Sequence, residues 1–131
     1  MKVFNFDAEL DRVVDGDTID VILDLGFKLK KKVRLRIKGI DTPECRTRNK
    51  QEKQAGLKVK LWVDVMLSST EFRVRSETVS GKYGGRVLGD IVFPSQQTLS
   101  GRLIQKGYAA SCPGGGRWKW KKKDLDYIIL N

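Results

Sequence analysis

The sequence predicts a mainly β domain of the α+β class, in which five strands close into a barrel, one helix lies between the third and fourth strands and a short helix follows the fifth. Three observations predict it. Residues 7–40 alternate apolar and polar side chains with the two-residue period of strands. Residues 51–67 carry apolar side chains four positions apart, as a helix does. Residues 71–93 return to strand-like alternation around a glycine-containing loop.

The first three strands are predicted from turn residues and alternation. Asp15-Gly16 is a turn signal that separates a short apolar run from a second run, residues 19–25, in which every other side chain is apolar. A second turn near Gly26 leads into a third run, residues 33–38. In this run Val33, Leu35 and Ile37 alternate with cations, so one face is expected in the core and the other at the surface.

The segment 51–67 carries two patterns. Val59, Leu61, Val63 and Val65 alternate as in a strand, but the length of the segment favours a helix. The expected buried stripe is Leu57, Leu61 and Val65, flanked by Trp62 and widened by Ala55 and Met66. Lys53, Lys60 and Asp64 are expected to face water.

The remaining elements are two strands and one helix. Residues 71–79 and 86–93 read as strands on either side of the loop 80–85, and residues 98–106 read as a helix ended by Gly107. The order of elements fits the OB architecture, a five-stranded Greek-key barrel. An SH3-like or a split barrel fits the pattern nearly as well. We expect a single domain over residues 1–131, with 111–131 as an atypical basic and aromatic C-terminal extension.

Composition excludes several classes of chemistry. The chain has no histidine, so imidazole serves neither as a base nor as a metal ligand. Its two cysteines, Cys45 and Cys112, cannot form a four-ligand zinc site by themselves. No apolar run approaches the roughly 20 residues of a membrane span, and the first residues do not resemble a signal peptide. We therefore expect a cytoplasmic protein without membrane contact, with secretion left open.

The charge is unevenly distributed. The formal net charge is +10, from 26 Lys and Arg against 16 Asp and Glu, yet residues 1–27 hold seven acids and only two bases. Residues 28–38 hold seven bases and no acid, and further cations gather in 46–60 and 117–123. Basic surfaces beside clustered carboxylates suit a protein that binds phosphodiesters, since cations neutralise phosphate and carboxylates hold a metal ion. A merely solvated surface is the alternative.

Two acidic motifs could carry chemistry. Asp15-Gly16-Asp17-Thr18 places two carboxylates around a turn, although the same residues also suit an ordinary turn. Asp41-Thr42-Pro43-Glu44 follows directly on a strand end. Two aspartates with a main-chain carbonyl could hold a hard cation, and Glu44 could then take a proton from water. Arg36 and Arg86 could bind phosphate or could be ordinary surface cations, and Lys82 and Tyr83 lie where a ligand could be clamped.

Taken together, these stretches resemble the staphylococcal nuclease (thermonuclease-like) family. The resemblance runs, in order and at sensible spacing, through residues 14–18, 34–44, 82–89 and, more weakly, 103–109. The most specific part is the pairing of the DGDT motif with an arginine, Arg36, that precedes Asp41-Thr42-Pro43-Glu44.

The resemblance implies an OB-fold nuclease that uses one Ca²⁺ to cleave DNA and RNA and leaves 3′-phosphate ends. It implies that Asp17 and Asp41 bind the metal by their carboxylates and Thr42 by its main-chain carbonyl. It further implies Glu44 as the general base, Arg36 and Arg86 on the scissile phosphate, and Lys82 and Tyr83 on the terminal phosphate of a bound nucleotide. Mg²⁺ and Mn²⁺ are alternatives to Ca²⁺, because oxygen ligands discriminate weakly among these ions.

Three departures from the family are visible. Gly84 and Gly85 precede Arg86 where the family usually has one glycine. The tyrosines that stack on the base in the best-known member are missing after residue 110, and its long third helix is not expected here. In its place stands a segment, 117–123, of tryptophans interleaved with cations, which either grips nucleic acid or packs on the barrel.

The leading interpretation is a metal-dependent nuclease of low sequence specificity, acting on DNA, RNA or both, monomeric and without an obligate protein partner. The alternative is a nucleic-acid-binding OB-fold module that has lost catalysis. A binding-only protein has no need of Asp17, Arg36, Asp41 and Glu44 together, and all four are present.

Overall fold

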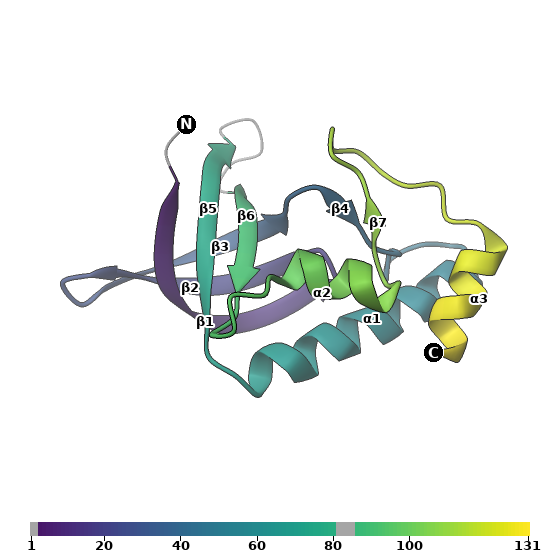
Figure 1. Ribbon diagram of the computed structural model, residues 1–131, viewed down its shortest axis with the longest axis horizontal. Helices are drawn as coiled ribbons and strands as arrows, with labels where there is room; N and C mark the ends of the chain where they lie inside the picture. The colour runs from purple at the N-terminus through teal and green to yellow at the C-terminus, as the bar shows by residue number, and fades with distance from the viewer. Residues whose placement is uncertain (1–2, 81–85) are drawn as a thin grey trace.

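The computed structural model describes residues 3–80 and 86–131 and contains the predicted five-stranded barrel. The elements, in chain order, are β1 (Phe4–Asp15), β2 (Thr18–Gly26), β3 (Leu29–Ile37), β4 (Ile40–Asp41), α1 (Lys50–Ser68), β5 (Phe72–Ser80), β6 (Arg86–Val92), α2 (Leu99–Lys106), β7 (Ala110–Ser111) and α3 (Lys122–Leu130). The chain of strands closes in the order β1-β2-β3-β6-β5, and β4 pairs with β7 in a separate two-stranded sheet (Figure 1).

The connectivity of the barrel decides between the architectures that the sequence left open. Strands β1, β2 and β3 form an antiparallel meander, β5 pairs antiparallel with both β1 and β6, and β3 pairs parallel with β6. The helix α1 connects the third barrel strand, by way of β4, to the fourth. This arrangement is the OB fold, with the helix where the sequence predicted it.

The barrel interior is filled by the residues that alternation predicted. Ile19 and Val21 of β2, Leu35 and Ile37 of β3 and Val74 of β5 are fully buried. The cations that alternate with them on β3 point outward. Removing this apolar surface from water is the main term that stabilises the barrel.

The buried face of α1 differs from the prediction. Leu57, Leu61 and Val65 are 47%, 63% and 61% exposed, which corrects the centre of the predicted stripe. Ala55 is buried and Trp62 and Met66 are partly buried against the core, as predicted, but the other buried side chains of the helix are those of Val59, Val63 and Leu67. Both stripes have the same four-residue spacing, so periodicity alone could not choose between them. Close approach to the barrel selects the small and β-branched stripe: a Cβ on Gly16, in the turn after β1, would lie only 2.5 Å from Val59 Cγ1.

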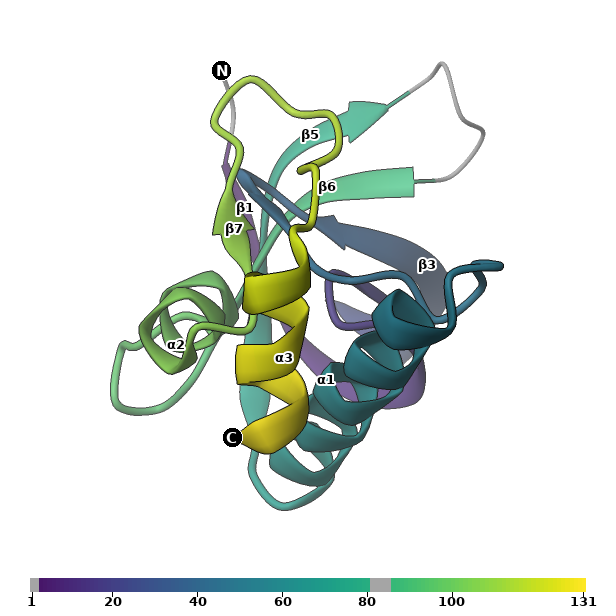
Figure 2. The same cartoon turned by 90° about the vertical axis from the view of Figure 1, so that its right-hand side faces the viewer.

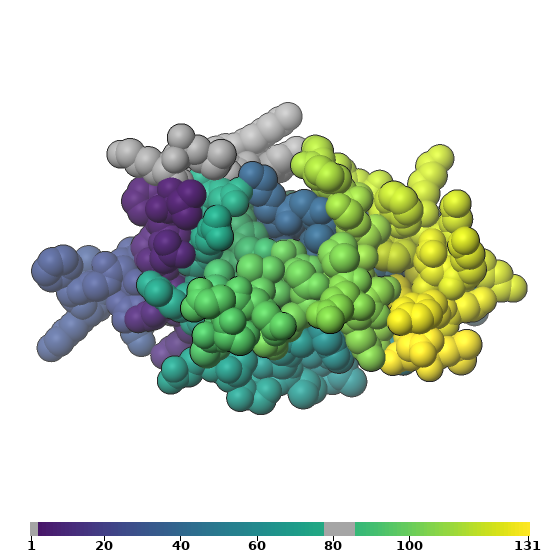
Figure 3. Space-filling view, in the orientation of Figure 1, coloured from purple at the N-terminus to yellow at the C-terminus, as the bar shows by residue number. Residues whose placement is uncertain are grey.

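The C-terminal extension contains a short third helix of nine residues, which the sequence did not predict. Helix α3 packs against α1 and buries Leu125 and Ile128, while Lys58 Nζ of α1 donates a 2.9 Å hydrogen bond to the Ile129 carbonyl. Figure 2 shows α3 between α2 and α1 at one end of the molecule. In the space-filling view that end is opposite the projecting β2–β3 hairpin (Figure 3).

Helix α2 confirms its predicted limits. The Thr98 side chain caps its N-terminus by accepting the Gly101 N–H, and Gly107 ends it at φ 80°, a left-handed conformation that favours glycine. Among the described residues, none of the helices is long and apolar enough to cross a membrane.

Candidate functional site

The site begins at the turn between β1 and β2, where Asp17 is held by two short contacts. Its side chain is 9% exposed. Its Oδ1 accepts the Thr18 hydroxyl at 3.0 Å, and its Oδ2 accepts the Thr42 backbone N–H at 3.1 Å. The second contact joins the turn to the segment that follows β4. The two acidic motifs, separated along the sequence, therefore meet in space.

Asp41 lies at the end of β4, which is fixed in place by its pairing with β7. Its carboxylate is 10% exposed. Burial, together with the nearby Asp17 charge, raises the pKa of Asp41 above its ordinary value, although hydrogen bonds from Trp118 and Trp120 and the charge of Arg36 oppose the change. Two buried carboxylates that repel one another form a place where an added positive charge is favourable.

Arg36 projects from β3 toward both carboxylates. Its Nη2 lies 3.4 Å from Asp17 Oδ2 and 3.8 Å from Asp41 Oδ1, and its Nη1 donates to the Ile37 carbonyl at 2.8 Å. Only 21% of the side chain is exposed. One guanidinium thus faces two carboxylates, and the three side chains form a compact charged cluster, as the sequence motifs suggested.

The loop that carries Glu44 is held by carboxylates. The Thr42 backbone N–H donates to Asp17, as described above. The Glu44 backbone N–H donates to Glu52 Oε2 at 3.1 Å, and the Cys45 backbone N–H donates to Asp15 Oδ1 at 3.1 Å. Three backbone donors within four residues are therefore each satisfied by an acidic side chain. Fixing the backbone at these points sets the direction in which the Glu44 side chain, 31% exposed, leaves the loop.

Close packing of α1 also defines this loop. A Cβ on Gly56 would lie 2.5 Å from the Glu44 carbonyl oxygen and 2.8 Å from that of Pro43. Helix α1 therefore approaches the backbone of the loop so closely that only glycine, which has no Cβ, fits at position 56 without a shift.

Replacing Gly56 by alanine is expected to lower the free energy of unfolding by about 1–2 kcal/mol, because overpacking against a backbone outweighs the better helix propensity of alanine. Urea denaturation measures the change. Gln54→Ala, on the exposed face of the same helix, should leave stability nearly unchanged. A Gly56→Ala protein as stable as the wild type would contradict the close approach.

The C-terminal strap, residues 117–120, contacts Asp41 through the oxygen that is not the one nearest Arg36. The Trp118 backbone N–H donates to Asp41 Oδ2 at 2.9 Å, and the Trp120 indole Nε1–H donates to the same oxygen at 3.3 Å. Arg117 pairs with the Glu44 carboxylate. The strap therefore reaches both of the acidic residues that the DTPE motif contributes.

Arg34, two residues before Arg36 on β3, forms a separate ion pair. Its Nε and Nη2 lie 2.8 Å and 3.2 Å from the two carboxylate oxygens of Asp20 on β2. This forked hydrogen bonding by Arg34, more than the charge itself, lowers the pKa of Asp20.

The Asp20→Asn variant is expected to lose about 1 kcal/mol of stability at pH 7 relative to wild type. A carboxyl whose folded-state pKa lies below its ordinary value of 3.8 stabilises the native state above that pH, and the contribution disappears as pH falls through the folded-state pKa. Urea denaturation at pH 7 and near pH 3 measures it, with Asp64→Asn, an exposed position on α1, as the control. A difference that grows as pH falls would contradict the assignment.

Besides the residues described above, the sequence predicted three others for the site, Lys82, Tyr83 and Arg86. Lys82 and Tyr83 lie outside the described residues. Arg86 begins β6 and is exposed, and the parallel register sets it opposite Arg34, with Leu88 opposite Arg36. Paired residues on neighbouring strands point to the same face of a sheet, and Arg34 and Arg36, two residues apart on β3, also share a face. Arg86 therefore lies on the same face of the barrel as Arg36, at the level of Arg34 and so two residues farther along from the acidic cluster.

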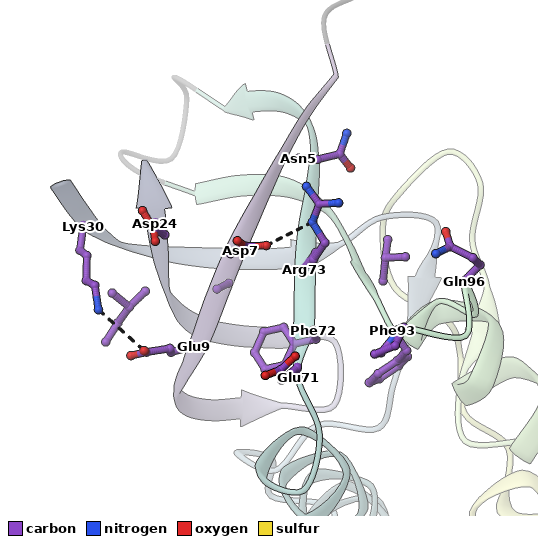
Figure 4. Close-up of a pocket in the computed structure, with 14 residues that line it drawn as sticks. Asn5, Asp7, Glu9, Asp24, Lys30, Glu71, Phe72, Arg73, Phe93 and Gln96 are labelled. Carbon is purple, nitrogen blue, oxygen red and sulfur yellow. Dashed lines mark ion pairs between the residues drawn. The ribbon is translucent and has the colours of Figure 1, made fainter. Parts of the chain in front are cut away.

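A cavity of about 610 Å³ lies elsewhere on the barrel, along β1 and β5 (Figure 4). Its charged lining is mainly acidic, and the two cations among its described lining residues are already in ion pairs with lining carboxylates, Arg73 with Asp7 at 3.3 Å and Lys30 with Glu9 at 3.7 Å. Excess negative charge disfavours a phosphate there. The described lining residues include none of Asp17, Arg36 and Asp41.

Sequence reasoning missed the residues that support the site. Asp15 and Glu52 accept backbone hydrogens of the loop, and the strap contacts Asp41 and Glu44. Asp15 belongs to the DGDT motif, and its position beside Asp17 was a signal that could have found it. The role of the strap rests partly on a backbone N–H, which no sequence pattern reveals.

Comparison with known proteins places this architecture in a family. No curated protein matches the chain. The family model described as staphylococcal nuclease homologue matches residues 34–125, which is more than half of the 131 residues and includes Arg36, Asp41, Glu44 and the strap. The chain therefore belongs to the family of staphylococcal nuclease homologues.

Proposed function

We propose that this protein is a metal-dependent nuclease that hydrolyses phosphodiester bonds of DNA and RNA with low sequence specificity. Family membership supports a nuclease or a nucleic-acid-binding module. The observation that favours catalysis is the cluster itself: two buried carboxylates, Asp17 and Asp41, lie within 4 Å of one nitrogen of Arg36, and Glu44 follows on the adjoining loop. Binding alone would not require acidic groups where phosphate must approach.

The donor set fits a hard divalent cation. Asp17, Asp41 and the Thr42 carbonyl would hold it, with water completing the shell. The hydroxyl of the same residue, Thr42 Oγ1, is buried and, within the described residues, has no hydrogen-bond partner, so Thr42 carries one oxygen besides the proposed carbonyl ligand that is not yet satisfied. Among the described residues, no group of three or more Cys, Asp or Glu side chains is placed to hold a metal ion, so two carboxylates and neutral oxygens are the proposed ligands. Calcium is proposed first, and Mg²⁺ or Mn²⁺ would use the same oxygens.

A bound cation would supply positive charge beside the phosphate and favour ionisation of a nearby water molecule. Glu44 acts as the general base: it accepts a proton from the water whose oxygen attacks phosphorus. Arg36 donates hydrogen bonds to the phosphate oxygens as negative charge develops on them. The bond from phosphorus to the 5′ oxygen breaks, that oxygen takes a proton from solvent, and the products carry a 5′-hydroxyl and a 3′-phosphate.

Three further residues are proposed on the basis of the motif. Arg86 would bind the scissile phosphate from β6, on the face that it shares with Arg36. Lys82 and Tyr83 would contact a terminal phosphate. Replacing Lys82 or Tyr83 by alanine should raise KM more than it lowers kcat, since contacts with a terminal phosphate bind substrate equally in the ground state and the transition state.

An assay on end-labelled single-stranded and double-stranded DNA tests the proposal. Hydrolysis is expected with Ca²⁺, is expected to stop in excess chelator, and should return when Ca²⁺ is restored, with 3′-phosphate ends on the products. Better activation by Mg²⁺ or Mn²⁺ would keep the ligands and change the ion. Full activity in chelator would remove the metal from the mechanism, and DNA binding without hydrolysis under every metal would favour the non-catalytic module.

A further inference from the structure

The strap is held against the site at both of its ends. On its N-terminal side, β7 pairs with β4, the strand that carries Asp41, and the Cys112 N–H donates to the Gly39 carbonyl at 2.7 Å. On its C-terminal side, α3 packs against α1 through buried Leu125 and Ile128. Figures 1 and 2 show the intervening segment arching between β7 and α3. Its position is therefore set by the fold at two separate points.

The strap contacts one oxygen of Asp41 and leaves the other to the site. Oδ2 accepts both the Trp118 N–H and the Trp120 indole N–H. Oδ1 lies 3.8 Å from the Arg36 nitrogen that also faces Asp17. The terminal torsion of an aspartate is broad and roughly twofold, so a carboxylate turns easily unless hydrogen bonds select one orientation. Two donors on the same oxygen make that selection.

Trp120 is suited to this task because its ring is itself anchored. The indole is partly buried and packs against the hydrophobic core, whereas Trp118 is 44% exposed and contributes only its backbone N–H. Groups that hydrogen-bond a metal-binding side chain commonly fix its orientation, and losing one typically lowers metal affinity about 10–100-fold.

We propose that the C-terminal strap is part of the cation site, with Trp120 as a positioning residue that holds Asp41 so that Oδ1 faces the space shared with Asp17. Arg117, which pairs with Glu44, brings the same strap to the proposed base. The inference rests on the proposed function, because it concerns the orientation of a carboxylate toward the cation. It gives the tryptophans of the basic C-terminal segment a role in the site.

The test is a Ca²⁺ titration of the full-length, ¹⁵N-labelled protein followed by NMR, which reports binding without any nuclease assay. Trp120→Phe keeps an aromatic ring and removes the indole N–H, and is expected to weaken Ca²⁺ binding about tenfold. Trp118→Phe is the matched control: it changes the neighbouring side chain and retains the backbone donor, so the apparent Kd should stay within about twofold of wild type.

A Trp120→Phe protein that is folded and binds Ca²⁺ as tightly as wild type would overturn the inference while the nuclease proposal stands. A wild-type protein that binds no Ca²⁺, Mg²⁺ or Mn²⁺ would overturn the proposed cation, and the inference with it. Equal weakening in both tryptophan variants would assign the effect to general packing of the strap and also overturn the role of the indole.

The indole N–H resonances of the wild-type protein and of Asp41→Asn provide a second measurement, which tests the inference if Trp120→Phe does not fold. The chain has three tryptophans, and each gives an indole N–H resonance. The Trp120 resonance is expected to move in Asp41→Asn and on addition of Ca²⁺, whereas that of Trp62, which stacks edge-on against Tyr108, should not. A Trp120 resonance unchanged by both would show that the indole does not bind Asp41.

Discussion

Replacing Glu44 by glutamine is expected to lower kcat about 10²–10⁴-fold, the usual contribution of a general base. Glutamine has nearly the same size but cannot accept the proton from the attacking water. The Glu44 side chain is 31% exposed and pairs with Arg117 at the surface, while the loop is held by backbone hydrogen bonds that the substitution leaves in place. Folding and nucleic-acid binding should therefore stay close to wild type.

Initial rates on labelled single-stranded DNA, together with fluorescence anisotropy for binding and thermal unfolding followed by circular dichroism, measure these outcomes. Glu71→Gln is the matched control, because Glu71 is an exposed glutamate that lines the distant cavity. It should leave the rate unchanged. A Glu44→Gln protein with wild-type kcat would remove Glu44 from the role of base, and one that no longer folds would show that the side chain is structural.

Asp41→Asn is expected to separate activity from stability. Losing a proposed metal ligand removes several kcal/mol of stabilisation of the developing charge, which corresponds to about a thousandfold loss in kcat/KM. The free energy of unfolding, measured without metal, should stay the same or rise by about 1 kcal/mol, because the variant no longer buries a charge next to Asp17. The asparagine oxygen can still accept the hydrogen bonds from Trp118 and Trp120.

Urea denaturation in chelator gives the stability, and the same nuclease assay gives the activity. Asp64→Asn removes an exposed carboxylate from α1 and should change neither quantity. A large loss of stability in Asp41→Asn would mean that the pairing of Asp41 with Arg36 holds the fold together. Retained activity would place the cation elsewhere.

The barrel and the two acidic motifs could be read from local chemistry. Alternation on β3 predicted which side chains enter the core, because a strand turns successive side chains to opposite faces. The Asp15-Gly16 turn was visible because those residue types favour turns. Asp17, Arg36, Asp41 and Glu44, the residues of the proposed site, lie at or near strand ends, so predicting the strands also predicted where these side chains lie along the chain.

The face of α1 could not be predicted in this way. Leu57, Leu61 and Val65 form a stripe of apolar residues with the same spacing as the buried one, so transfer from water alone does not choose between the two. The structure buries the stripe of Ala55, Val59, Val63 and Leu67. Gly56 lets the helix approach the backbone of the Glu44 loop, and at that distance the smaller side chains fit between helix and barrel.

Helix α3 and the strap show the same limit at the C-terminus. A helix of nine residues is only marginally stable in water on its own, so its stability depends on tertiary packing. The local sequence of residues 122–130 was therefore a weak basis for predicting the helix. It forms because Leu125 and Ile128 find a partner in α1. Its docking, together with the pairing of β7 with β4, then brings Trp120 to Asp41, 79 residues away in the chain.

The sequence by itself determined the barrel strands, the turn at Asp15 and the acidic and basic residues of the proposed site, because these follow from side-chain alternation and short-range turn chemistry. Only the tertiary structure decided which stripe of α1 is buried, that the C-terminal segment ends in a helix, and that its tryptophans bind Asp41. Those outcomes depend on packing and hydrogen bonds between distant segments, and part of that bonding uses backbone N–H groups that every residue except proline carries.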